Sequence, residues 1–178
     1  CEHVVACTGN FARKTGEMVG LDIPVIPVEH QYIVTDPHPE ILKRKAAGLP
    51  EQAVLRDSDA GYYLREEAGG MILGPYEENA PCCYVDGPSA ESEYELFNGD
   101  LDRLMPHVEA CMERVPAFAE VGVKTIYNGA IAYTPDGNPI VGPAWGLKNF
   151  WLNAVSYTHL RAHETLMNLV CRLLLEKM

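Results

Sequence analysis

Basic residues are scarce in this chain of 178 residues, and their scarcity limits the partners that it can bind. Lysine and arginine together number 14, against 25 aspartate and glutamate residues, so the formal net charge is −11. Nucleic acids and anionic membrane surfaces are both negatively charged and need a basic patch on the protein that binds them. We therefore expect neither nucleic acid nor a membrane as a partner.

Long apolar runs and metal-ligand spacings are absent as well. No run approaches the roughly 18 apolar residues that a membrane-spanning helix needs. The six cysteines form no CxxC pair and no Cys/His spacing, so no metal site is predicted. The adjacent Cys82 and Cys83 are expected to stay unlinked thiols in a reduced compartment rather than to form a strained disulfide.

A glycine-rich phosphate loop is also missing, and so are internal repeats. A complete small enzyme that uses a nucleotide cofactor would be expected to carry such a loop. The chain opens at Cys1 inside an apolar run, and no signal peptide can be read from it. We therefore expect an internal fragment that completes a site begun elsewhere.

The most distinctive stretch that is present is 127–143, YNGAIAYTPDGNPIVGP. Two apolar runs flank the segment 134–139. In this segment Pro135 presets φ, the side chain of Asp136 can bond the backbone ahead, and Gly137 accepts a positive φ. This pattern predicts a β-hairpin. Gly129 and Gly142 remove side chains from both arms, which suits close approach by another body. A solvent-exposed hairpin with loose ends is an equal alternative.

The first segment, 2–9 (EHVVACTG), is predicted to be a strand that ends in small residues. A helix at 11–19 is expected to follow, capped by Asn10 and closed by Gly20. In open α/β sheets, ligands bind at the carboxyl ends of strands, where small residues let a phosphate or ribose come close. An ordinary buried strand before a turn is the simpler interpretation of these residues taken alone.

A second strand is predicted at 28–35, with alternating parity. His30 and Tyr32 then point to the same face, roughly 6.5–7 Å apart along the strand. Such a pair can hold a proton between its members or orient an amine, because imidazole titrates near neutral pH. A structural pair bonded to backbone carbonyls is the alternative.

The middle of the chain predicts a short helix at 41–47 and then an antiparallel meander. The strands of the meander are expected at 54–56, 62–65 and 71–74. Arg56 and Arg65 would lie on adjacent strands, where a guanidinium fork can bind a substrate carboxylate. Ion pairs with neighbouring acidic residues are the alternative.

Ser92 and Glu95 form a capping-box pattern ahead of a long amphipathic segment, which predicts a helix beginning there. Pro106 is expected to kink this helix or to begin a second one. We interpret the apolar stripe as core packing rather than a cofactor site. Further strands are predicted at 122–127 and 149–154.

Five segments, taken in order, carry a resemblance to a known family: HVVACTGNFARKTGEMVGL, IPVIPVEHQYIVT, VLRDSDAGYYLREEAGGMILGPYE, LFNGDLDRLMPHVEACMERVP and NGAIAYTPDGNPIVGP. They resemble the dimethylglycine/sarcosine dehydrogenase branch of the D-amino-acid-oxidase-like FAD-dependent oxidoreductases. The resemblance implies an α+β fold, in which a substrate domain with a mixed, largely antiparallel sheet and helices joins a remnant of an FAD-binding Rossmann domain. The implied division is 1–20 for the end of the Rossmann part, 21–127 for the substrate domain and 128–154 for the return toward the FAD domain.

The resemblance also implies an activity. The parent enzyme would demethylate an N-methylated amino acid of the dimethylglycine or sarcosine type by hydride transfer to FAD, and the fragment alone is expected to be inactive. Longer members append a folate-binding region, so tetrahydrofolate is expected only with a missing carboxyl-terminal part. The implied location is the bacterial cytoplasm or, in a eukaryote, the mitochondrial matrix. A non-catalytic substrate-domain module that acts as a scaffold or interaction surface is the alternative.

Residue roles follow from matching positions in the family. His30 and Tyr32 are expected to orient the substrate amine and take its proton. Arg65, Asn128 and Tyr133 are the expected substrate-binding residues. The expected cofactor-binding residues are Ala6, Cys7, Thr8, Gly9, Gly129, Pro135 and Asp136.

Two departures from the family pattern bear on these roles. Many oxidases of the wider superfamily place an arginine just before the TPDG-like turn, where this chain has Ala130, Ile131 and Ala132. A carboxylate contact must then come from elsewhere, or the substrate differs. The glycine-rich segment expected after 151–153 (WLN) is also replaced by another sequence.

That other sequence, 155–178, resembles a technical sequence rather than a natural protein. VSYTHLRAHET resembles the translation of a transposase-type sequencing adapter, and LVCRLLLEK resembles that of a flow-cell primer, with 165–168 spanning a sample index. We expect an artefactual tail without functional meaning. Its leucines also fall at helical spacing, which fits an amphipathic helix as the alternative.

Overall fold

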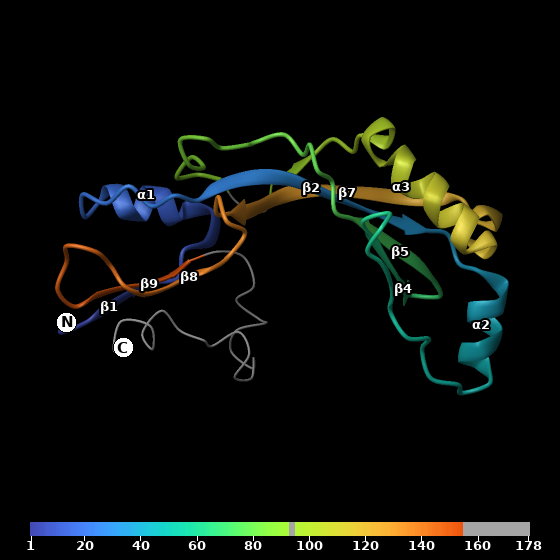
Figure 1. Cartoon of the computed structure of the whole chain (residues 1–178). Helices are drawn as coiled ribbons and strands as arrows, with labels where there is room; N and C mark the ends of the chain where they lie inside the picture. Colours follow the sequence, from blue (N-terminus) through green and yellow to red (C-terminus); the bar gives the residue numbers. More distant parts are fainter. Residues whose placement is uncertain (93–94, 155–178) are drawn as a thin grey trace. The chain divides into compact units, whose positions relative to one another are not determined.

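The computed structural model describes residues 1–92 and 95–154. They form two compact units between which the chain passes repeatedly (Figure 1). Within the described residues, the first unit comprises 1–28, 81–92 and 130–154, and the second comprises 29–80 and 95–129. The tail predicted at 155–178 lies outside the described residues.

The first unit is built on a three-stranded sheet in the order β1-β9-β8. Its strands are β1 (Val4–Ala6), β9 (Phe150–Ala154) and β8 (Ile140–Pro143). β1 and β9 are parallel, whereas β8 runs antiparallel to β9. Strands predicted at both ends of the described chain are therefore confirmed, and they are neighbours in one sheet.

The helix predicted at 11–19 is shorter and begins differently. A 3₁₀ turn, η1 (Gly9–Phe11), leads into α1 (Ala12–Glu17), and no side chain caps either element. The predicted cap at Asn10 is wrong, because its Nδ2 donates instead to the carbonyl of Ala130 at 3.2 Å. This long-range partner replaces the local one. Gly20, with φ of 74°, closes the segment as predicted.

The second unit contains a six-stranded sheet in the order β3-β4-β5-β2-β7-β6. The bounds are β3 (Leu55–Asp57), β4 (Tyr62–Glu67), β5 (Gly70–Pro75), β2 (Ile26–Thr35), β7 (Val123–Tyr133) and β6 (Leu96–Phe97). The first three strands form the predicted antiparallel meander. The first residues of β2 and the last residues of β7 belong to the first unit.

Helix α3 (Leu101–Arg114) packs on one face of this sheet and lies beside β5 (Figure 1). Its buried residues Leu104 and Val108 share a core with Ile33 of β2 and Leu73 of β5. Fully burying a large apolar side chain contributes about 1.5–3 kcal/mol, so this face stabilises the packing of α3 on the sheet. Because side chains alternate along β2, His30 and Tyr32 lie on the opposite face from Ile33.

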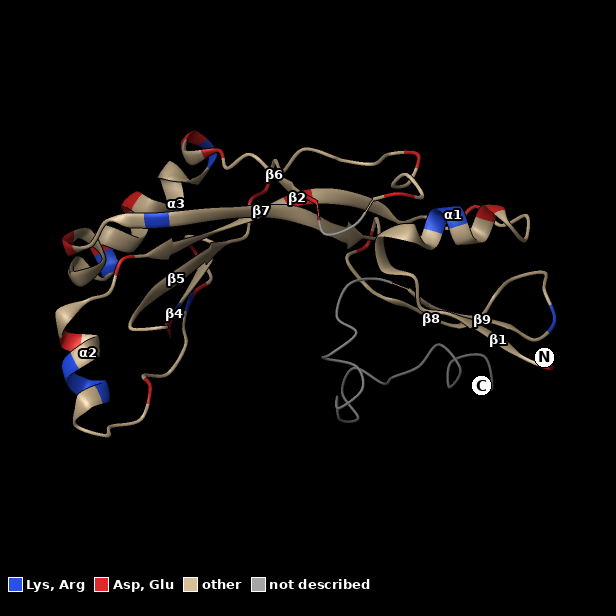
Figure 2. Ribbon diagram, turned by 180° about the vertical axis from the view of Figure 1, so that it is seen from behind, with Lys and Arg blue, Asp and Glu red and all other residues tan. Residues whose placement is uncertain are grey.

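Helix α2 (Pro39–Ala46) confirms the short helix predicted at 41–47 and begins slightly earlier. His38 caps it by accepting the backbone N–H of Glu40 on Nδ1 at 3.2 Å. Basic residues occupy its last turn (blue in Figure 2), where they complement the negative end of the helix dipole. Gly48 follows with φ of 67°.

The helix predicted to begin at Ser92 begins at Leu101 instead, so the capping-box prediction is wrong. Asp100 is the N-cap, and its carboxylate accepts the backbone N–H of Arg103 at 3.1 Å. Part of the intervening segment forms β6, which pairs with β7. Tertiary strand pairing outweighs local helix propensity there. The helix continues undivided through Pro106.

The hairpin predicted at 127–143 is wrong. β7 is paired with β2 and β6, whereas β8 is paired with β9 in the other sheet. The turn itself forms as predicted, with Gly137 N–H donating to the Thr134 carbonyl at 3.0 Å. Turn residues specify a reversal of the chain but not the strand partner. Pro139 also has no backbone N–H, so it cannot donate the hydrogen bond that would continue a hairpin from the turn.

Two features of the described residues match absences in the sequence. Cys82 and Cys83 are not joined by a disulfide. In the described part of the chain, no helix is long and apolar enough to cross a membrane.

Candidate functional site

His30 and Tyr32 share one face of β2, as predicted, with Gln31 fully buried on the other face. Tyr32 stacks on Tyr127 of the neighbouring strand β7, with ring centroids 5.2 Å apart and planes 28° apart. Sequence reasoning missed Tyr127. Its position two residues before Gly129, on the same side of the strand, is the signal that could have identified it.

Burial lowers the pKa of His30 below its ordinary value, and the negative charge of Glu77 partly opposes this by raising it. A lowered pKa leaves the imidazole neutral at neutral pH, with a lone pair that can accept a proton. The pair on this face is thus a neutral base beside a phenol.

A polar cluster lies on the opposite face of the same strands. Arg103 of α3 donates through Nη1 to Glu29 Oε2 and through Nε to Glu77 Oε2, each at 2.8 Å. Gln31 accepts the backbone N–H of Asp100 at 2.6 Å and donates to the Asp100 carbonyl at 3.3 Å. Charge-assisted bonds of this kind are the stronger class. They attach the start of α3 to β2, the strand that carries His30 and Tyr32.

Asn128 belongs to this cluster. It is fully buried, and its Nδ2 donates to Glu29 Oε2 at 2.8 Å and to the Asn98 carbonyl at 2.9 Å. Its side chain therefore lies on the face opposite His30 and Tyr32. A direct contact of Asn128 with substrate stays a prediction.

Arg65 lies on β4, two strands away from β2. Its Nη1 pairs with the carboxylate of Glu67 at 2.6 Å and donates to the Glu66 carbonyl at 3.3 Å. Arg65 is thus held in a local ion pair, but its partner is Glu67 and not Asp57 or Glu66, the carboxylates expected from the sequence. Arg56 instead lies over the ring of Tyr76, with its guanidinium carbon 5.1 Å from the ring centre.

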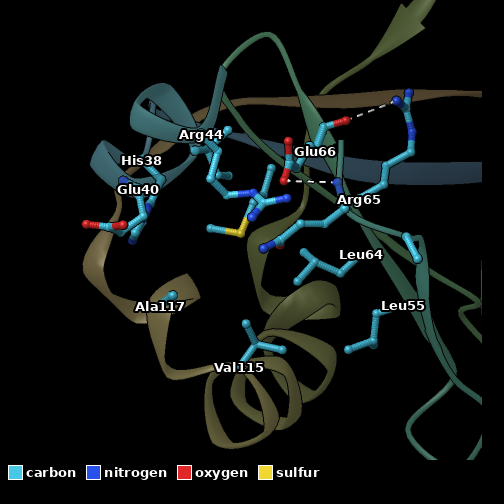
Figure 3. Close-up of a pocket in the computed structure, with 13 residues that line it drawn as sticks. His38, Glu40, Arg44, Leu55, Leu64, Arg65, Glu66, Val115 and Ala117 are labelled. Carbon is cyan, nitrogen blue, oxygen red and sulfur yellow. Dashed lines mark hydrogen bonds between the residues drawn. The ribbon is translucent and has the colours of Figure 1, made fainter. Parts of the chain in front are cut away.

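A cavity of about 230 Å³ lies between α2, the meander and the end of α3 (Figure 3). Leu55, Leu64 and Val115 supply apolar walls. Arg65 lines it, but Figure 3 shows its side chain leading away toward Glu66. None of the other predicted site residues lines this cavity.

The small-residue turn after β1 lies in the first unit. Ala6 is buried, whereas Cys7 and Thr8 are exposed. The hydroxyl of Thr8 accepts that of Thr15 at 2.9 Å. Gly9 has φ of 52°, and a Cβ placed there would meet no described atom within 4 Å. This turn therefore offers exposed backbone where a phosphate or ribose can approach.

Pro135 and Asp136 belong to the same unit as this turn, whereas Gly129 is the last residue of a segment of the second unit. The segment that begins at Ala130 lies beside the turn. The bond from Asn10 to Ala130 joins the two, and Ala132 shares a core with Ala6. Beyond it, Tyr133, Pro135 and Asp136 are all exposed. The pKa of Asp136 is lowered, chiefly because its carboxylate accepts the backbone N–H of Asn138.

The two glycines on the arms of 127–143, Gly129 and Gly142, have different explanations. Gly142 has φ of 147°, which residues with a side chain rarely adopt. The backbone conformation alone therefore explains why glycine occupies this position. Gly129 needs no positive φ, and a Cβ there would meet only Leu96 among the described residues, at 3.6 Å. A Cβ at Gly129 would therefore fit without a clash among the described residues.

The described residues thus contain a parallel β1–β9 pair followed by an exposed turn, and a six-stranded sheet backed by a helix. The chain belongs to the family of FAD dependent oxidoreductases, whose family model matches residues 1–159. The expected α+β fold and the expected FAD dependence of the family are thereby confirmed.

Two of the relatives that the chain resembles are dehydrogenases by name. The chain is 44% identical over 157 residues to dimethylglycine dehydrogenase, mitochondrial, from Rattus norvegicus, covering 84% of this chain and 18% of that protein. It is 32% identical over 149 residues to sarcosine dehydrogenase, mitochondrial, from Mus musculus, covering 84% and 15%. The chain thus spans less than a fifth of the length of these relatives.

Solved structures show the same fold. L-proline dehydrogenase from P. horikoshii matches with a TM-score of 0.64 and 22% identity, covering 86% of this chain and 37% of that one. Glycine oxidase from Geobacillus kaustophilus matches with a TM-score of 0.63 and 20% identity, covering 88% and 36%.

Proposed function

We propose that this chain is part of an FAD-dependent enzyme that oxidatively demethylates N-methylated amino acids of the dimethylglycine or sarcosine type. The observation that carries the proposal is the neutral imidazole of His30 beside Tyr32 on one face of β2, in a chain 44% identical to a dimethylglycine dehydrogenase. Membership of an oxidoreductase family favours this enzyme over the scaffold alternative.

In this proposal the chain supplies both cofactor-binding and substrate-binding residues. Residues 1–20 and 128–154 complete the FAD domain, and 21–127 form the substrate domain. The proposal is supported by the placement of Ala6 to Gly9 and of Pro135 and Asp136 in the first unit, while His30 and Tyr32 lie in the second.

The residues present fit an FAD site, because the turn after β1 offers exposed backbone at Gly9 and open space around it. Cys7, Thr8 and Gly9 would lie against the ribose and pyrophosphate, and Gly129, Pro135 and Asp136 would border the cofactor. FAD, when bound, would be the acceptor of the hydride that leaves the N-methyl carbon. Water then hydrolyses the iminium to formaldehyde and the demethylated amine.

The contribution of this chain is to prepare the amine. An N-methyl ammonium group must lose its proton before hydride can leave, because the nitrogen lone pair stabilises the developing cation. Neutral His30 is suited to accept that proton, and the Tyr32 hydroxyl to orient the nitrogen. Tyr133 and Arg65 would contact the substrate carboxylate, for which Arg65 must exchange its pairing with Glu67.

The enzyme would work on a small N-methyl amino acid, without nucleic acid or membrane as a partner. We place it in the cytoplasm of a bacterium or in the mitochondrial matrix of a eukaryote. The second location is supported by the names of the rat and mouse relatives, both of which are called mitochondrial.

The test is turnover of dimethylglycine and sarcosine by the complete enzyme that contains this chain, followed as formaldehyde release. We expect His30→Ala and Tyr32→Phe each to lower kcat/KM by about 10²–10⁴-fold, the usual contribution of a positioned proton-transfer group. His107→Gln is the matched control, because that imidazole is bonded to the Ala60 carbonyl at 2.9 Å. Unchanged turnover in both site variants would remove the catalytic role.

A further inference from the structure

Tyr127 is a site neighbour that none of the predicted roles includes. Its ring stacks on Tyr32 from the adjacent strand, at 5.2 Å between centroids and 28° between planes. A stacked neighbour restricts the rotation of a phenol about its side-chain torsions and so fixes where its hydroxyl lies. With 39% of its surface exposed, Tyr127 also presents ring area away from Tyr32.

The backbone that carries Tyr127 is held from the opposite face. The next residue, Asn128, is fully buried, and its Nδ2 donates both to Glu29 Oε2 and to the Asn98 carbonyl. Glu29 is in turn bonded by Arg103 at 2.8 Å. Because neighbouring residues of a strand point to opposite faces, fixing Asn128 fixes the direction in which Tyr127 leaves the sheet.

The position beyond Tyr127 on the same face is Gly129, which has no side chain. A Cβ there would meet only Leu96 among the described residues, at 3.6 Å. The Tyr127 ring therefore stacks on Tyr32 and still has part of its surface exposed. A substrate group held near Tyr32 would lie close to this ring.

We propose that Tyr127 is a positioning and specificity-determining residue: its ring holds the Tyr32 phenol in place and limits the size of the N-alkyl group that the site accepts. This inference rests on the proposed function. No atom of Tyr127 takes part in bond making or breaking.

The experiment compares N-methylglycine with N-ethylglycine as substrates of the complete enzyme. Tyr127→Phe keeps the ring and should retain kcat and KM within about twofold. Tyr127→Ala removes it, and the ratio of kcat/KM for N-ethylglycine over N-methylglycine should rise about tenfold or more, because one methylene discriminates by about 10–200-fold in a fitted pocket. The kcat for N-methylglycine should fall, since the Tyr32 phenol is released.

Tyr76→Ala is the matched control. Tyr76 is 40% exposed, close to the value for Tyr127, but its ring pairs with Tyr63 at 6.1 Å and lies under Arg56. This variant should leave the substrate ratio unchanged. If Tyr127→Ala does not fold, Tyr127→Leu takes its place; it should lower kcat for N-methylglycine while Tyr127→Phe does not.

Two outcomes separate this inference from the proposed function. If the wild-type enzyme oxidises N-methylglycine and Tyr127→Ala keeps both the wild-type ratio and kcat, the inference is overturned and the function stands. If the wild-type enzyme oxidises neither substrate, the function fails, and the Tyr32 ring-proton shifts in the full 178-residue chain decide the positioning role. The shifts should differ from the wild-type values in Tyr127→Ala and match them in Tyr127→Phe. Wild-type shifts in both variants would overturn the positioning role.

Discussion

His30 is subject to two opposing influences on its proton. Burial disfavours the imidazolium and lowers its pKa, while the carboxylate of Glu77 favours it. Glu77 is itself held by Arg103 and lies close to Gln31. The proton affinity of the candidate base is therefore set partly by a cluster on the other face of its strand.

We expect the midpoint of the His30 titration, followed by NMR, to lie below the ordinary value of about 6.5. Glu77→Gln should lower it further, because the substitution removes the charge that favours imidazolium. The pKa of His30 is lower in the folded state than in the unfolded state. Neutral His30 therefore makes its full contribution to the free energy of unfolding above about pH 6.5, and this contribution is lost as the pH falls. An unchanged or raised His30 midpoint in the Glu77→Gln variant would contradict the electrostatic account.

Single residues also mark where prediction from sequence was sufficient. The shared face of His30 and Tyr32 follows from strand alternation, which is a local rule. The partners of Glu29 could not be predicted, since Arg103 and Asn128 approach it from 74 and 99 positions away. No local pattern encodes such pairings.

At the scale of elements, β7 carries the residue that best tests close approach to the site. Gly129→Ala adds a methyl group that meets only Leu96 at an ordinary 3.6 Å among the described residues. We expect the thermal midpoint of the 178-residue chain to change little. The complete enzyme should lose activity by about tenfold or more, because the methyl group would occupy the space that substrate and cofactor need.

Gly48→Ala is the comparison for that variant. Gly48 has φ of 67° and a Cβ there would meet nothing within 4 Å, so the substitution strains the backbone far from His30 and Tyr32. It should lower stability, typically by about 1 kcal/mol, and leave kcat unchanged. A Gly129→Ala enzyme with full activity would exclude close approach at this position.

Two elements show why the remaining fold escaped prediction. The pattern at 92–95 favours a helix start, yet the residues after it form β6, which pairs with β7. The helix begins only at Leu101, where Asp100 caps it. The turn at 134–139 forms as predicted, yet its two arms enter different sheets. In both cases a strand partner distant in sequence decides the outcome, and local propensity does not.

At the scale of the whole molecule, the chain builds two separate cores. Leu152 belongs to the core of the first unit, and Leu104 to that of the second. Both are almost completely buried, at 2% and 0% exposure. Among the described residues, none belongs to both core clusters.

We expect Leu104→Ala and Leu152→Ala to act on different units. Each should cost about 2–5 kcal/mol, the usual range for a buried leucine truncated to alanine. Hydrogen exchange should lose protection in β4 and β5 for Leu104→Ala and in β1 and β9 for Leu152→Ala. Equal loss in both units from either variant would show that they unfold together.

The alternation of β7 has a consequence for how this strand can evolve. Tyr127 and Gly129 face the candidate site, while Asn128 between them faces the polar cluster. Inserting or deleting one residue just ahead of Tyr127 would exchange these faces, placing a phenol among charges and an amide beside Tyr32. Among relatives, insertions or deletions there should therefore involve two residues at a time. A single inserted residue should be accommodated by a β-bulge that restores the alternation of faces.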